Sequence, residues 1–149
     1  MICLALSRIV SGLQRTLEIG NLDAKRDWGY AADYVEAMHL MLQQKKPDDY
    51  VISTGQTNSV RTFMEKACEI LDIKIAWKGK GSKEVGINTR NNKPIIRVNP
   101  KFYSPAEVEH LLGDSSKAKR KLLWRPKHNF DQLIEIMLKS ELDSIKNPE

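Results

Sequence analysis

The sequence has few of the residues that mark a specialised structural class. Its 149 residues include only two cysteines, Cys3 and Cys68, which form no CxxC pair, so a disulfide framework and a Cys-rich zinc site are both excluded. No apolar run approaches the roughly 18–20 residues of a membrane span. The apolar stretch at residues 1–7 is too short for a signal peptide. We therefore expect a cytoplasmic protein that folds without a metal ion.

The motifs of a self-contained enzyme are also missing. A dinucleotide-binding loop needs GxGxxG or GxxGxxG, but Gly79 and Gly81 are followed by Glu84 where a third glycine would stand. No tyrosine has a lysine four positions later, no two histidines have the HxxxH spacing of metal ligands, and GxSxG is absent. The chain's own residues thus predict no catalytic residue, no metal site and no bound cofactor.

What the sequence does contain is ordinary for one globular domain, apart from its charge. Hydrophobic residues make up 41% and charged residues 29%, and the net charge is +5. Residues 74–103 hold eight lysines and arginines but only one acidic residue, Glu84. This basic strip could attract a polyanion or simply be a solvated face. Aromatic residues are not interleaved with the charges as a stacking platform requires, which argues against nucleic acid as the partner.

Hydrophobic periodicity and capping residues predict a mixed α/β chain. The expected helices span residues 1–14, 34–46 after an Asp33 cap, 60–71, 104–113 after a Ser104–Glu107 capping box, 114–122, and a last one from Asn129. The expected strands are 17–22, 50–54, 75–77, 85–87 and 95–98, with a turn at residues 91–92. The first helix lacks an N-cap, as expected of a chain cut inside a larger fold.

One run of residues is far more specific than these patterns. Residues 20–29, Gly-Asn-Leu-Asp-Ala-Lys-Arg-Asp-Trp-Gly, resemble GDP-mannose 4,6-dehydratases, which are extended short-chain dehydrogenase/reductases. Matching blocks follow in the family's order at 33–37, 49–52, 59–61, 84–86, 105–108, 112–114 and 124–127. The resemblance covers the C-terminal part of the family enzyme only.

The resemblance implies a fold and a function. Residues 1–58 would be the edge of the Rossmann cofactor domain, and residues 59–149 the smaller, mixed α/β domain that binds the nucleotide sugar. The intact family converts GDP-mannose to GDP-4-keto-6-deoxymannose with NADP, on residues that precede this part. We therefore expect this chain alone to be inactive and to bind no NADP. The partners implied are GDP-mannose or GDP, and either further copies of the chain or a cofactor domain.

The resemblance also assigns three substrate-binding residues. Arg26 matches an arginine that contacts the substrate pyrophosphate, a task suited to the planar guanidinium fork; the alternative is a surface arginine paired with a neighbouring aspartate. Asn21 would meet the guanine or ribose, or else only shape a turn. Glu107 would bind the ribose hydroxyls, although the capping box explains it equally well. Trp28 could either pack in the core or stack on a ligand.

The sequence departs from the family at several positions. Ser104 stands where the family usually has a second phosphate-binding arginine, Tyr30 replaces a histidine, Ala32 a basic residue, and Leu123 a glycine. Losing one hydrogen bond to a charged group weakens affinity by roughly ten- to a hundredfold. Two other functions therefore stay open: an interaction module that assembles with a full-length subunit, and a polyanion-binding domain that uses the basic strip.

Overall fold

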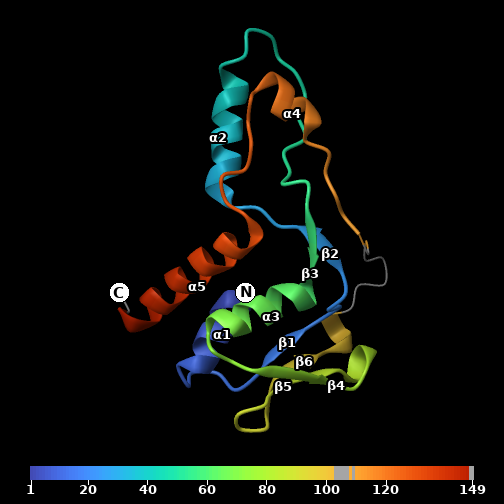
Figure 1. The fold of residues 1–149 in the computed structure, drawn as a ribbon, viewed down its shortest axis with the longest axis vertical. Coiled ribbons are helices and arrows are strands. Elements are labelled where there is room, and N and C mark those ends of the chain that lie inside the picture. The colour runs from blue at the N-terminus through green and yellow to red at the C-terminus, as the bar shows by residue number, and fades with distance from the viewer. Residues whose placement is uncertain (103–107, 109, 148–149) are drawn as a thin grey trace.

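One end of the molecule is a four-stranded sheet covered by three helices (Figure 1). The computed structural model describes residues 1–102, 108 and 110–147. The strand order is β1 (Leu17–Ile19), β6 (Lys93–Val98), β5 (Val85–Asn88) and β4 (Ile75–Lys78). β1 is parallel to β6, and the other pairs are antiparallel. The covering helices are α1 (Ile2–Val10), α3 (Val60–Ile70) and α5 (Phe130–Lys146).

These helices and strands share the main hydrophobic core. Leu6 of α1, Phe63 of α3, Ile96 of β6 and Ile134 of α5 are all almost fully buried in it. Both cysteines lie there too. Burial raises the pKa of Cys3 to about 11 and that of Cys68 to about 12, so both are structural thiols.

The other end of the molecule is smaller and built mainly from helices. It contains α2 (Ala31–Leu42), α4 (Ser116–Lys121) and the extended segment 50–56, which pack around Ala37, Ala118, Leu122 and Trp124. The antiparallel pair β2 (Lys25–Asp27) and β3 (Thr57–Ser59) lies between the two ends (Figure 1). Two 3-10 helices, η1 (Gly81–Lys83) and η2 (Pro100–Phe102), complete the described elements.

Most of the elements expected from periodicity are confirmed, although the first helix ends at Val10 rather than residue 14. The strand predicted at residues 50–54 is wrong: the segment is extended, but among the described residues none pairs its backbone as a strand would. A short run of residues with high strand propensity makes a strand only when a neighbouring strand is available.

Three cap predictions have different outcomes. The Asn129 capping box is confirmed, because its side chain accepts from the Gln132 amide and the Gln132 side chain accepts from Asn129. Asp33 is not an N-cap, since α2 begins at Ala31 and buries Asp33 in its first turn. Asp114 accepts from the Ser116 amide at 2.9 Å, but Ser115 occupies the N-cap position.

The helix predicted at residues 104–113 is wrong in the part that can be checked. Ser104 and Glu107, on which its capping box rests, lie outside the described residues. Val108 and residues 110–113 are not helical. Instead, His110 forms a parallel bridge with Lys25, and the Leu111 amide donates to the Lys25 oxygen at 3.3 Å. This backbone is therefore satisfied by β2 rather than by a helix of its own.

Leu123 provides a test of backbone strain. It follows the C-cap of α4 with a φ of 55°, and it is 84% exposed. A left-handed conformation costs an L-residue about 1–2 kcal/mol, and glycine avoids this cost. Part of that gain in stability is offset because glycine makes the unfolded chain more flexible. We expect Leu123→Gly to raise the free energy of unfolding by about 0.5–1 kcal/mol in urea denaturation. In the control Met38→Gly, an exposed position in the interior of α2, it should fall by about 1 kcal/mol; a loss at both positions would contradict the strain.

Candidate functional site

The loop between β1 and β2 carries Asn21, one of the residues singled out by the sequence, and leads into β2, which carries Arg26. Asn21 shapes its first turn, since its Oδ1 accepts from the Asp23 amide at 2.9 Å. The backbone oxygens of Leu22 and Ala24 accept from the first amides of α3, at 2.8 Å and 3.1 Å. The side chains of these two residues are buried. The loop is therefore fixed to the start of α3, with its polar side chains on the outside.

A cavity of about 360 Å³ opens beside this loop, lined by Asn21, Asp23, Lys25 and His110. The His110 imidazole is held by Thr57, whose Oγ1 lies 3.1 Å from His110 Nε2. The lining thus combines an amide, a carboxylate, an ammonium group and an imidazole. Such a set suits a polar ligand that carries both hydroxyl groups and negative charge.

Arg26 follows Lys25 in β2 and is half-buried. Its Nη1 donates to the Lys25 oxygen at 2.8 Å and to the Val108 oxygen at 2.6 Å. The guanidinium therefore reaches the backbone immediately after Glu107. The position of Glu107 itself is outside the described residues, so its predicted role stays a prediction.

Asp27, the next residue of β2, fixes the end of segment 50–56. Its Oδ1 accepts from the Thr54 amide at 3.0 Å and from Thr54 Oγ1 at 2.6 Å, and its Oδ2 accepts from the Gly55 amide at 2.9 Å. Charge-assisted hydrogen bonds of this kind are roughly twice as strong as neutral ones. Asp27 thus has a structural role that the sequence pattern did not distinguish from its neighbours.

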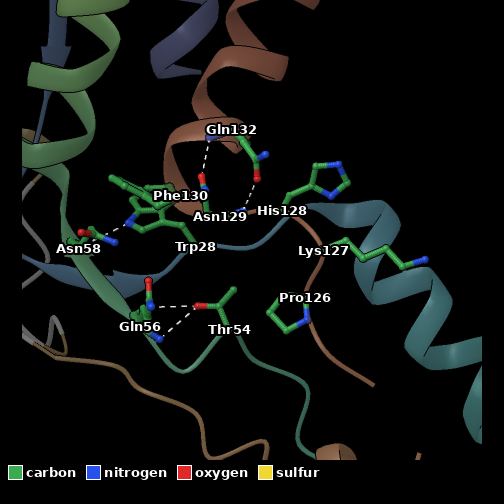
Figure 2. Close-up of a pocket in the computed structure, with 10 residues that line it drawn as sticks. All are labelled: Trp28, Thr54, Gln56, Asn58, Pro126, Lys127, His128, Asn129, Phe130 and Gln132. Carbon is green, nitrogen blue, oxygen red and sulfur yellow. Dashed lines mark hydrogen bonds between the residues drawn. The ribbon is translucent and has the colours of Figure 1, made fainter. Parts of the chain in front are cut away.

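Trp28 packs in the core, which was one of the two roles expected for it. Its ring lies 4.8 Å from that of Phe63, and its Nε1 donates to the Asn58 oxygen at 3.2 Å. It also borders a second cavity, of about 260 Å³, shown in Figure 2. The other lining residues are Thr54, Gln56, Asn58, Pro126, Lys127, His128, Asn129, Phe130 and Gln132. Stacking of Trp28 on a ligand stays a prediction.

Next to this second cavity lies a buried carboxylate whose role sequence analysis missed. Asp33 is 2% exposed and accepts from the amides of Lys127 and His128, both at 3.0 Å, while His128 Nδ1 lies 2.9 Å from its Oδ1. Its backbone oxygen accepts from Trp124 Nε1 at 2.8 Å. Burial alone would raise the pKa of Asp33, but the hydrogen bonds from His128 and Lys127 hold it below the ordinary value.

Tyr30 and His128 extend this arrangement. The two rings meet edge-on with centroids 4.7 Å apart. Tyr30, one of the departures from the family pattern, therefore packs on the residue that binds Asp33. Spacing could not have revealed the Asp33–His128 pair, since 95 positions separate the two residues.

The architecture around these sites occurs in known enzymes. RMD from Pseudomonas aeruginosa, solved with NADPH, superposes with a TM-score of 0.74 at 19% identity, over 95% of this chain and 41% of that one. UDP-glucose 4-epimerase from Thermotoga maritima superposes at 0.69, also at 19% identity, over 97% and 40%. The fold is that of the C-terminal part of an extended short-chain dehydrogenase/reductase.

Sequence comparison places the chain more narrowly. Residues 1–137 match the family model of GDP-mannose 4,6 dehydratase, and the chain belongs to that family. It is 52% identical to the GDP-mannose 4,6 dehydratase of Drosophila melanogaster over 132 residues, which are 88% of this chain and 33% of that protein. For the human protein the identity is 45%, over 97% of this chain and 39% of the relative. The chain thus spans about a third to two fifths of the length of these relatives.

The structure gives the positions of the individual site residues and the lengths of the helices. It brings Asn21 to the first cavity and Arg26 beside Lys25, in the same strand. In the part of the chain that is described, no helix is long and apolar enough to cross a bilayer.

The buried carboxylate gives a prediction with a defined pH dependence. Because the pKa of Asp33 is lower in the folded protein, the stability it contributes is present above about pH 4 and is lost as the pH falls through the folded value. We expect Asp33→Asn to lower the free energy of unfolding by about 1–3 kcal/mol at pH 7, and by less as the pH approaches that value. Urea denaturation of both proteins from pH 7 to pH 3 measures this. A difference that does not shrink on acidification would contradict the ionised hydrogen-bonded form.

Proposed function

We propose that this chain is the nucleotide-sugar-binding portion of a GDP-mannose 4,6-dehydratase. That activity converts GDP-mannose to GDP-4-keto-6-deoxymannose, a precursor of GDP-fucose, in the cytoplasm. The observation that carries the proposal is the position of Arg26, which lies in the most family-specific run of the sequence and follows the cavity residue Lys25. In this proposal Arg26 binds the diphosphate, and Asn21 and Glu107 bind the nucleoside.

The chemistry of these residues favours binding over catalysis. A guanidinium such as that of Arg26 binds phosphate oxygens through paired donors. The Lys25 ammonium adds a positive charge to the lining of the first cavity. Turn geometry already engages one lone pair of the Asn21 oxygen, but its amide donors face no partner among the described residues. Proton and hydride transfer are proposed to fall to residues outside this chain.

The chain's residues do not fit a dinucleotide cofactor. Gly79 follows β4 directly, and Gly81 is the first residue of the three-residue η1 rather than of a long helix. A Cβ at Gly79 would lie 2.4 Å from the Lys83 oxygen, so a close approach of the backbone explains this glycine. We propose that the NADP of the intact enzyme is held elsewhere, in line with the NADPH of the Pseudomonas aeruginosa neighbour.

An exposed apolar surface indicates that this chain also binds a protein partner. Val35, Met38 and Leu42 form a stripe at i, i+3 and i+7 along α2, and each is more than half exposed. Val51, in the unpaired segment 50–54, is exposed as well. Patches of this kind mark interaction surfaces. We propose that a cofactor-binding portion, or a subunit that contains one, covers them; the same surface also favours the alternative of a non-catalytic interaction module.

The first test separates diphosphate binding from general attraction to anions. We expect GDP to bind weakly to the wild type, and Arg26→Ala to weaken it by on the order of 1.5–3 kcal/mol, the value of a hydrogen bond to a charged group. Lys78→Ala and Lys80→Ala serve as controls from the basic strip. They should change the affinity little, since exposed charges act only through screened attraction.

Isothermal titration at two salt concentrations measures these affinities. A polyanion-binding domain would give the reverse order, with steep salt dependence and no effect of Arg26→Ala. If the wild type does not bind GDP at all, the nucleotide-sugar function fails and only the interaction module remains.

The second test concerns turnover. We expect the pure chain to form no 4-keto product from GDP-mannose and NADP, because no tyrosine–lysine pair or cofactor loop is available in it. Full-length GDP-mannose 4,6 dehydratase of Drosophila melanogaster, assayed alongside, is the positive control. Measurable turnover by the pure chain would refute the proposal that this chain binds the substrate while catalysis needs residues outside it.

A further inference from the structure

Arg61, outside the proposed site, donates four hydrogen bonds from its side chain to carboxylate oxygens. It is the second residue of α3, and its side chain is 23% exposed. Its Nη1 and Nη2 donate to the two carboxylate oxygens of Glu84 at 2.6 Å and 3.0 Å. Its Nε and Nη2 donate to Asp23 Oδ1 at 3.1 Å and 3.0 Å. One guanidinium thus bridges two carboxylates from distant parts of the chain.

The surroundings hold this guanidinium in one orientation. It lies over the Trp77 ring, 4.9 Å from the centroid, and Trp77 is itself fixed by a hydrogen bond from Nε1 to Glu65 Oε1 at 2.8 Å. Hydrogen bonding to Glu84, and then to Asp23, raises the pKa of Arg61 above its ordinary value. The bidentate contact with Glu84 also requires a planar fork, which lysine does not have.

The Arg61 bridge ends in the loop that borders the first cavity. Asp23 is 74% exposed and lines that cavity together with Asn21 and Lys25. The Arg61 amide also donates to the Leu22 oxygen at 2.8 Å, so Arg61 holds the loop by both its backbone and its side chain. Glu84, only 12% exposed, anchors the other side of the guanidinium to the sheet, immediately before β5.

The ion pair between Arg61 and Asp23 also changes the charge of the first cavity. Among the described residues that line the cavity, Asp23 is the acidic one, and an unpaired carboxylate there would repel a diphosphate. The Arg61 guanidinium offsets that charge at 3.0 Å. Loop position and cavity charge therefore depend on the same side chain.

We infer that Arg61 is a positioning residue for nucleotide binding: it holds Asp23, and with it the loop that carries Asn21 and leads into Arg26, in the arrangement that receives the nucleotide. This inference rests on the proposed function for its ligand. It goes beyond that function by assigning affinity to a residue that lines neither cavity. The loop restraint itself exists with or without GDP, and so can be tested separately.

The experiment compares Arg61→Gln and Arg61→Lys with the control Arg90→Gln. Arg90 lies in the turn between β5 and β6, and the substitution removes the same charge there. Among the described residues, its side chain binds the exposed Asp72 and no other carboxylate. Hydrogen–deuterium exchange is followed in peptides that cover residues 20–26 and, as an internal reference, residues 93–98 of β6. GDP affinity is measured by isothermal titration, and the melting temperature is recorded for each variant.

We expect Arg61→Gln to speed exchange in residues 20–26 by about tenfold, leave residues 93–98 unchanged, and weaken GDP binding by about tenfold or more. Arg61→Lys should not restore either value, since an ammonium group has no planar fork to make the bidentate contact with Glu84 and hold Asp23 at the same time. Arg90→Gln should leave both unchanged. Should Arg61→Gln not fold, Asp23→Asn removes only the exposed end of the bridge, and is expected to speed exchange in the same residues.

Unchanged exchange in residues 20–26, or full recovery with lysine, would overturn the inference. So would loosening of β6 to the same extent, because the role would then be general stability. If the wild type binds no GDP, the proposed function fails, while the exchange comparison still shows whether Arg61 restrains the loop.

Discussion

The arrangement of the two ends of the molecule depends on one buried negative charge. A carboxylate as deeply buried as that of Asp33 is costly unless each oxygen is hydrogen-bonded, and here backbone amides and an imidazole supply the donors. The donors belong to Lys127 and His128, in the segment that leads from α4 into α5. Asp33 belongs to α2 at one end of the molecule, and α5, which begins just after His128, packs in the main core at the other end. The hydrogen bonds of Asp33 therefore connect the two hydrophobic clusters through only a few residues.

Between these clusters, β2 divides its side chains between two tasks. Asp27 binds the Thr54–Gly55 turn and so belongs to the framework. Arg26 extends instead toward the backbone at Val108, near the first cavity. Alternation along a strand sends neighbouring side chains to opposite faces. Asp27 therefore has a structural role, while under the proposed function its neighbour Arg26 is left for the ligand.

The predictability of each element follows the range of the interactions that form it. The stripe of α3 and the Asn129 capping box depend on residues three or four positions apart, and both were predicted correctly. The strand at 50–54 and the helix before Gly113 depend on partners far along the chain, and both were wrong. Arg26 and Asn21 could be singled out only through family resemblance. The Asp33–His128 pair and the Arg61 bridge needed coordinates, and the boundary near residue 58 stays a prediction.

The segment at residues 50–54, which pairs with no described strand, also affects how fast the chain is degraded in a cell. An extended stretch that pairs with no strand among the described residues, beside an apolar helix face, is the kind of surface that chaperones and proteases recognise in incompletely assembled proteins. If a partner covers this surface, the supply of that partner limits how much of the chain survives. Synthesis beyond that supply would then raise turnover rather than abundance, so the stoichiometry of the assembly would be maintained by degradation.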